Sequence, residues 1–318
     1  MKKCFKRGLI GAGAAGITAY GLMTAANEAL FNRKIVFPDE FNQKMSGCDN
    51  SHLGEFLENN LKWLEEYGYE RHFIVSDKGY RLTGYLMKPE KESDVFVFGA
   101  HGYRSSGKRE FSKFVQYYLE KGYNVFFPDH VASGESEGLM CTFGYNERED
   151  CMKWLTYLTD TFGKDIKIIL HGVSMGCATV CMMSGRDDLP ENVRFTVADC
   201  GFTRAEDFFN WKIRKMGIKP SAPIVKGIFL AGKINHGFDL FDVSPVDSVK
   251  KAKVPMFFVH GAKDGLVPAY MCTELYESCG SGMKEILIVP EADHAQAFIH
   301  GRKEYAEIIE RFAEALEL

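Results

Sequence analysis

The residues best suited to chemistry are a serine, an aspartate and a histidine that each follow an expected strand. Ser174 lies in Gly172-Val173-Ser174-Met175-Gly176, after a largely apolar, partly β-branched run from Lys167 and before small residues suited to a helix. This context predicts a sharp strand-to-helix turn that exposes the serine hydroxyl as a nucleophile. The flanking glycines have no Cβ, so strand and helix can pass closely. The N–H of Met175, at the helix start, is expected to bind a developing oxyanion.

The base and the acid that a serine nucleophile needs follow the last two expected strands. Histidine is the usual base because its pKa is near neutral, and a carboxylate fixes its tautomer. His294 follows the last strand, and Asp264 follows the strand before it. We therefore expect both side chains to reach the sheet edge that carries Ser174. Asp199 also ends a strand and is the rival acid, and Asp264 alternatively fits an ordinary turn.

A second oxyanion donor is expected in the loop His101-Gly102-Tyr103, which follows an apolar strand. Glycine lets the backbone turn an N–H toward the site, and we predict that the donor is the N–H of Tyr103. We interpret His101 as a structural histidine and Asp293 as a loop residue.

Strands and helices alternate along the chain, which predicts an α/β fold with a mostly parallel central sheet and helices on both faces. A β-hairpin is expected from residues 69 to 87. The further strands are expected at residues 94–100, 123–128, 167–173, 193–199, 255–260 and 285–289, and the helices at 41–67, 111–120, 145–161, 175–183, 270–278 and 301–316.

One segment interrupts the alternation. About fifty residues separate Cys200 from Val254, where one crossover helix would suffice, and an insertion of this size favours a helical cap, at about residues 203–250, over a structureless loop. From Gly201 to Lys253 there are ten Lys or Arg and five Asp or Glu. This excess fits a solvated lid surface, and a basic face toward anionic lipid or an anionic substrate is the alternative.

The N-terminal residues 1–31 are predicted to be a membrane-directed segment, which leaves residues 32–318 as the catalytic domain. Four basic residues lie within Met1 to Arg7, and Gly8 to Asn27 carries no charge. Such a pattern is typical of a transmembrane helix with a cytoplasmic N-terminus, and it implies membrane association through residues 8–31 and an extracytoplasmic catalytic domain. A cleaved signal peptide, a soluble helix and a cytoplasmic enzyme remain open alternatives.

The same stretch contains a formal dinucleotide-binding pattern, Gly11-Ala12-Gly13-Ala14-Ala15-Gly16. A nucleotide fold requires an apolar strand before the glycines, and here the preceding residues are highly charged. The first acid after a later strand, Asp39, lies 28 positions beyond Gly11, whereas roughly 20 are expected. No cofactor is therefore expected.

Composition excludes several other classes of protein. The net charge is −4 without a long basic run, which gives no support to nucleic-acid binding. The nine cysteines form no CxxC pair, so neither a metal site nor a disulfide framework is indicated, and buried reduced thiols are expected.

Taken together, these motifs resemble the α/β-hydrolase superfamily, near the bacterial branch of serine aminopeptidase-like and acylaminoacyl-peptidase-like serine hydrolases. One departure is the sequence His130-Val131-Ala132-Ser133-Gly134, where similar members often have Arg-Gly-His-Gly. The pieces that carry the resemblance are His101-Gly102-Tyr103, Pro128-Asp129 with the loop to Gly138, Gly172 to Gly176, His260-Gly261 with Asp264 and Val267-Pro268, and Asp293-His294.

The resemblance implies a cofactor-free hydrolase of an ester, thioester or amide. We expect an acyl-enzyme on Ser174, a small-molecule acyl substrate and carboxylesterase-like activity. A serine peptidase or an acyltransferase on the same triad is the alternative within this class, and a non-catalytic ligand-binding protein is the alternative from another class.

Overall fold

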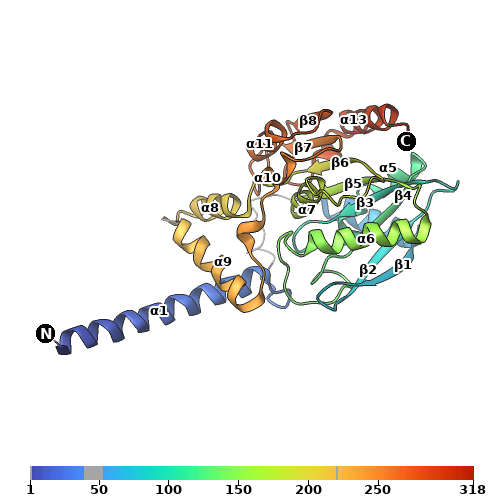
Figure 1. The fold of residues 1–318 in the computed structure, drawn as a ribbon. Coiled ribbons are helices and arrows are strands. Elements are labelled where there is room, and N and C mark those ends of the chain that lie inside the picture. The colour runs from blue at the N-terminus through green and yellow to red at the C-terminus, as the bar shows by residue number, and fades with distance from the viewer. Residues whose placement is uncertain (1, 39–52, 220) are drawn as a thin grey trace.

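Alternating strands and helices build an eight-stranded sheet in the order β1-β2-β4-β3-β5-β6-β7-β8 (Figure 1). The computed structural model describes residues 2–38, 53–219 and 221–318, with side chains from residue 16 onward. Strands β1 and β2 form the expected hairpin, β2 is antiparallel to β4, and the six strands from β4 to β8 in the sheet are parallel. The strands are β1 (Glu70–Val75), β2 (Arg81–Met87), β3 (Val95–Ala100), β4 (Asn124–Pro128), β5 (Lys167–Val173), β6 (Val193–Asp199), β7 (Met256–Gly261) and β8 (Lys284–Val289).

Side chains alternate between the two faces of the sheet and fill a core on each. In β3, Val95 and Val97 pack into one core, and Phe96 and Phe98 pack into the other. Helices therefore cover both faces, as the apolar strands predicted. The first core includes residues of α3 (Gly54–Tyr67), α4 (Gly107–Phe111), α5 (Val115–Glu120), α12 (Ala297–His300) and α13 (Arg302–Ala315), and the opposite face is covered by α6 (Glu147–Phe162), α7 (Met175–Ser184), α10 (Pro245–Val249) and α11 (Tyr270–Ser278).

Two expected helices differ from the structure. The helix expected at residues 111–120 is divided into α4 and α5, because the chain turns between Ser112 and Phe114. The helix expected from residue 41 is observed only as α3, from Gly54, since residues 39–52 lie outside the described part of the chain.

The insertion between β6 and β7 is helical, as its length predicted. We call residues 203–250 the cap. The cap contains α8 (Ala205–Lys215), α9 (Ala222–His236), a short 3-10 helix (Leu240–Asp242) and α10. Cap helices α8 and α9 lie between the sheet and the N-terminal helix α1 (Lys2–Phe31), which extends away from the body (Figure 1).

The C-terminal half of α1 packs against cap helix α9. Asn27 is fully buried and donates a hydrogen bond to the carbonyl of Ile228 at 3.1 Å. Met23 lies against Gly227, where an added Cβ would be 2.8 Å from its side chain. Phe31 ends the helix with 1% of its surface exposed. This half of α1 is therefore part of the folded body, although the sequence assigned it to a separate membrane-directed segment.

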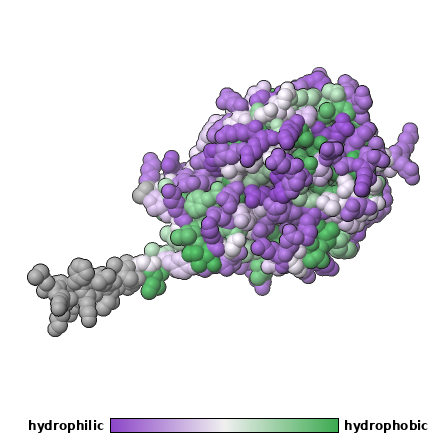
Figure 2. Space-filling model, in the orientation of Figure 1, coloured by the Kyte–Doolittle hydropathy of each residue, from purple (hydrophilic) through white to green (hydrophobic). Residues whose placement is uncertain are grey.

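The same helix presents apolar side chains to solvent. Ile17 and Leu22 on α1, and Leu230 and Ile234 on α9, are each more than half exposed, and Figure 2 shows apolar surface where α1 meets the body. Within the residues whose side chains are described, no helix combines the length and the apolar character needed to cross a membrane. The prediction of a transmembrane helix is thus not supported.

Candidate active site

Ser174 occupies the apex of the turn between β5 and α7. Its backbone angles, φ 57° and ψ −115°, are strained for a residue with a side chain. The turn needs both glycines, because a Cβ on Gly172 would overlap the carbonyl of Gly176, and a Cβ on Gly176 would overlap the carbonyl of Ala100. The N–H of Ser174 donates to the carbonyl of Asp199 at 2.8 Å and so ties the turn to β6.

The structure brings the three predicted catalytic side chains together. The hydroxyl oxygen of Ser174 lies 2.9 Å from Nε2 of His294, and Nδ1 of His294 lies 2.7 Å from Oδ2 of Asp264. An Nδ1–H that donates to Asp264 leaves Nε2 free to accept the serine proton. The side chain of His294 is 11% exposed and that of Asp264 is fully buried, so the relay is largely shielded from water.

In this relay, Asp264 stabilises the protonated form of His294, and the two histidines beside Asp264 stabilise its ionised form. Burial alone would lower the pKa of His294, but the negative charge and the hydrogen bond of Asp264 outweigh it, and the net effect raises the pKa. Burial alone would raise the pKa of Asp264, but the two histidines that contact it, His294 and His260, hold that pKa well below its usual range. The carboxylate therefore stays ionised and favours the imidazolium.

The loop after β7 fixes the orientation of Asp264. Its Oδ1 accepts hydrogen bonds from the N–H groups of Leu266 and Val267, both at 2.8 Å. Its Oδ2 lies 2.9 Å from Nε2 of His260, as well as near His294. The sequence analysis included His260 in a motif but missed this contact. The i,i+4 spacing of a strand-end histidine and an aspartate was the available signal.

Asp199, the rival acid, is placed differently. It lies at the end of β6, and its Oδ2 accepts a hydrogen bond from the hydroxyl of Tyr305 at 3.0 Å. Burial is the main cause that raises the pKa of Asp199 to about 6. Since the carboxylate bonded to the imidazole is that of Asp264, the geometry favours Asp264 as the acid.

Two backbone N–H groups remain available beside the serine. Within the described residues, neither the N–H of Tyr103 nor that of Met175 donates a hydrogen bond. Gly102 brings the first loop close to the serine, because a Cβ on Gly102 would lie 3.3 Å from the Cβ of Ser174. These two N–H groups, one in the strand-end loop and one at the helix N-terminus, are the candidates for an oxyanion hole.

The side chains of these two donor residues point into a shared apolar cluster. Met175 belongs to it, and the ring of Tyr103 packs against it, 5.8 Å from the ring of Phe143. The cluster joins the cap, α1 and the catalytic loops. Its phenylalanines are Phe31, Phe143, Phe202, Phe208, Phe209, Phe229 and Phe238.

The loops around the site are held by polar contacts. His101 is fully buried; its Nδ1–H donates to the carbonyl of Gly102 at 2.7 Å, and its Nε2 accepts from the N–H of His130 at 3.0 Å. It is therefore a structural histidine, as predicted. Asp293 is a loop residue whose Oδ1 accepts from the N–H of Gly265 at 2.9 Å, which links the loops that carry His294 and Asp264.

One group of side chains has the composition of a metal site. Donor atoms of Cys200, Asp264 and His294 lie within 4.8 Å of one another. A metal here would have to replace the hydrogen bonds already made to both oxygens of Asp264, so these residues fit a proton relay better than a metal centre. The seven cysteines whose side chains are described are all buried, and none of them forms a disulfide.

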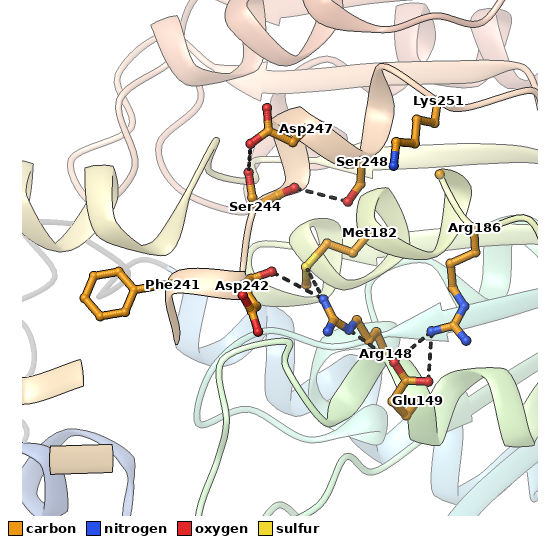
Figure 3. Close-up of a pocket in the computed structure, with 11 residues that line it drawn as sticks. Arg148, Glu149, Met182, Arg186, Phe241, Asp242, Ser244, Asp247, Ser248 and Lys251 are labelled. Carbon is orange, nitrogen blue, oxygen red and sulfur yellow. Dashed lines mark hydrogen bonds and ion pairs between the residues drawn. The ribbon is translucent and has the colours of Figure 1, made fainter. Parts of the chain in front are cut away.

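A hollow lies at the C-terminal end of α7. It has a volume of about 410 Å³, and its lining does not include Ser174. The charged side chains in it bind one another, as Figure 3 shows for Arg186, which contacts Glu149 at 2.7 Å, and for Arg148, which reaches the carbonyl of Asp242 at 3.4 Å. The hollow is therefore separate from the candidate active site.

Comparison with known proteins supports the fold. Residues 97–220 match the family model described as "alpha/beta hydrolase fold". YqkD of Bacillus subtilis is 26% identical over 75% of this chain and 77% of its own length, and the membrane protein YNL320W of Saccharomyces cerevisiae is 28% identical over 73% and 75%. The esterase Pf2001 of Pyrococcus furiosus superposes with a TM-score of 0.64 at 21% identity, over 79% of this chain and 92% of its own. The chain thus has the α/β-hydrolase fold.

Proposed function

We propose that this protein is a serine hydrolase that cleaves carboxylic esters through an acyl-enzyme on Ser174. The observation that carries the proposal is the continuous relay from the hydroxyl of Ser174 to Nε2 of His294, at 2.9 Å, and from Nδ1 of His294 to Asp264, at 2.7 Å. Nucleophile, base and orienting acid at these distances are what acyl transfer by a serine requires. The α/β-hydrolase fold supports the broader class, a hydrolase.

In the first half of the reaction, the oxygen of Ser174 attacks the carbonyl carbon while its proton moves to Nε2 of His294. The N–H groups of Tyr103 and Met175 stabilise the oxyanion of the tetrahedral intermediate. The imidazolium then gives its proton to the departing alcohol, and the serine ester remains.

In the second half, His294 takes a proton from water as the water oxygen attacks the serine ester. The second tetrahedral intermediate collapses, the acid leaves, and Oγ of Ser174 recovers its proton from the imidazolium. Asp264 keeps the imidazole oriented throughout and stabilises its positive charge.

The apolar cluster beside the oxyanion donors supports an apolar substrate group. Because the side chains of both Tyr103 and Met175 join this cluster, a group bound next to the reacting carbonyl would lie against aromatic rings. Burial of each methylene there contributes about 0.8 kcal/mol. We therefore expect esters of medium-length acyl chains to be hydrolysed faster than acetates.

Two measurements test the proposal. Wild-type protein should react covalently with a fluorophosphonate probe and hydrolyse nitrophenyl esters, and Ser174→Ala should do neither while it remains folded. Probe labelling that persists in Ser174→Ala, or a wild-type protein that is inert to every probe and ester, would refute it. Aminoacyl amides assayed beside the esters separate a peptidase from an esterase, since a peptidase would prefer the amides.

We also propose that α1 attaches the enzyme to a membrane. The exposed apolar side chains of Ile17 and Leu22 support this, as does the name of the yeast relative, a membrane protein. Full-length protein should sediment with membranes, and Ile17→Ser combined with Leu22→Ser should reduce that fraction. Recovery of the intact wild-type chain in the soluble fraction would reject the attachment.

A further inference from the structure

A buried ion pair lies beside the candidate active site and has no part in the proposed acyl transfer. Glu110, in α4, and Lys113, three residues later, are 2.5 Å apart between Oε1 and Nζ. Their side chains are only 10% and 7% exposed. Burying two charges is costly even when they pair, and a hydrophobic pair often packs as well. Such a pair calls for an explanation other than general stability.

Each partner of the pair holds one catalytic loop. The carboxylate of Glu110 accepts a hydrogen bond from the N–H of Gly102, at 3.4 Å, and Ser105 is among the residues that lower the pKa of Glu110. Both residues belong to the loop that carries Tyr103. The ammonium group of Lys113 donates to the carbonyl of Ala295, at 3.3 Å, directly after His294. The pair therefore links the predicted oxyanion loop to the loop of the histidine.

The backbone conformation is constrained at both contacts. Ala295 has a φ of 57°, which is uncommon for a residue with a side chain. At Gly102, an added Cβ would lie 3.3 Å from Oε2 of Glu110. Because the N–H of Gly102 donates to Glu110, it is not free to bind an oxyanion, and Tyr103 is the next residue of the loop. The pair thus holds the peptide group directly before the predicted oxyanion donor.

We propose that Glu110 and Lys113 are positioning residues that set the oxyanion loop and the histidine loop at the separation that acyl transfer requires. The inference rests on the proposed function, since it assigns a role within the same site. Misplacement of reacting groups by about 1 Å can cost 10²-fold in rate, so the loss of either charge should reduce kcat far more than it changes KM.

The charges also act on His294. Glu110 is one of the negative charges that raise the pKa of His294. A positive charge close to an imidazole lowers its pKa, and the ammonium group of Lys113 binds the carbonyl of the next residue, Ala295. Removing Glu110 and removing Lys113 should therefore shift the kinetic pKa in opposite directions. The titratable groups around the imidazole are Asp264, Asp199 and Cys200 at the strand ends, His260 behind Asp264, and Glu110 with Lys113.

The test compares Glu110→Gln, Lys113→Met and the double variant with wild type, using a short nitrophenyl ester, a fluorophosphonate probe and thermal unfolding. Lys121→Met is the matched control, because Lys121 forms an exposed pair with Glu310 at 2.6 Å. In folded single variants, kcat should fall about 10²-fold with little change in KM. The kinetic pKa should fall in Glu110→Gln and rise in Lys113→Met. The control should match wild type.

The double variant keeps the inference testable if Lys113→Met alone does not fold, because it leaves no unpaired buried charge. Its kinetic pKa should return toward that of wild type, whereas its kcat should stay low because nothing joins the two loops. A kcat restored to the wild-type value, or single variants whose pKa moves in the same direction, would overturn the inference. If wild type itself neither reacts with the probe nor turns over, the proposed function fails and the inference fails with it. If wild type and variants react equally, the inference alone fails.

Discussion

Substitution of Phe31 tests directly whether the N-terminal helix α1 packs against the cap. Phe31 is 1% exposed, and its ring lies 5.8 Å from the rings of Phe209 and Phe238 and 6.2 Å from that of Phe143. All three contacts are edge-to-face, an arrangement that stabilises aromatic pairs beyond simple burial. If this packing is present, Phe31→Ala removes a side chain from the core, although the residue ends a helix that the sequence assigned to a membrane segment.

The expected cost follows from this environment. Substitution of a buried phenylalanine by alanine typically destabilises a protein by about 3 to 5 kcal/mol, because a cavity remains. For a chain of 318 residues, an unfolding entropy of about 2.1 cal/mol/K per residue turns that cost into a fall in Tm of about 4.5 to 7.5 °C. Activity should fall as well, since Phe31 belongs to the cluster that the oxyanion residues join.

Thermal unfolding of the full-length protein, followed by near-ultraviolet circular dichroism, measures this effect. Ile17→Ala is the matched control, because Ile17 lies on the same helix and is 76% exposed; its Tm should change by less than about 1 °C. A Phe31→Ala protein whose Tm and ester turnover equal those of the control would refute the packing of α1 on the cap.

Three further outcomes are expected. Asp264→Asn should lower kcat/KM by about 10⁴-fold. Asp199→Asn should lower it less than about 10-fold, because the hydrogen bond to the imidazole of His294 comes from Asp264. If both variants fold and Asp199→Asn is the more damaging, Asp199 is the acid. The value of kcat/KM should fall on acidification, because only the neutral imidazole of His294 can act as base. The midpoint should lie above 6.5, the ordinary pKa of a histidine, since the surroundings of His294 raise its pKa. A midpoint below 6 would contradict this direction. Deletion of residues 1–15 should leave Tm unchanged, whereas deletion of residues 1–31 should destabilise the fold, and equal Tm values for both truncations would show that residues 16–31 contribute nothing.

The relation between sequence and site is clearest at Ser174. The flanking glycines, the apolar strand before them and the small residues after them are local features, so the strand-to-helix turn could be predicted from a dozen residues. His294 and Asp264 could be predicted as its partners because each follows a parallel strand, and the carboxyl ends of such strands meet at one edge. The sequence left Asp199 as a rival, since it ends a strand in the same way.

Other features could not be predicted from local sequence patterns. The helix expected at residues 111–120 is interrupted by a turn at residues 112–114, and the ammonium group of Lys113 in this turn reaches the histidine loop. The sequence analysis singled out neither Lys113 nor Glu110. Their burial depends on the loops of residues 101–105 and 293–296, which approach from other strands.

The sequence by itself determined the type of fold, the candidate nucleophile and the approximate positions of its candidate partners, because these follow from periodicity, glycine stereochemistry and strand order. Only the tertiary structure decided that Asp264 rather than Asp199 contacts His294, that Asn27 and Phe31 are buried against the cap, and that Glu110 and Lys113 join two loops. The physical reason is distance along the chain: the bond between Asn27 and Ile228 joins residues 201 positions apart. The register of the strands and the packing of the cap set such separations, and no local pattern of residues encodes either.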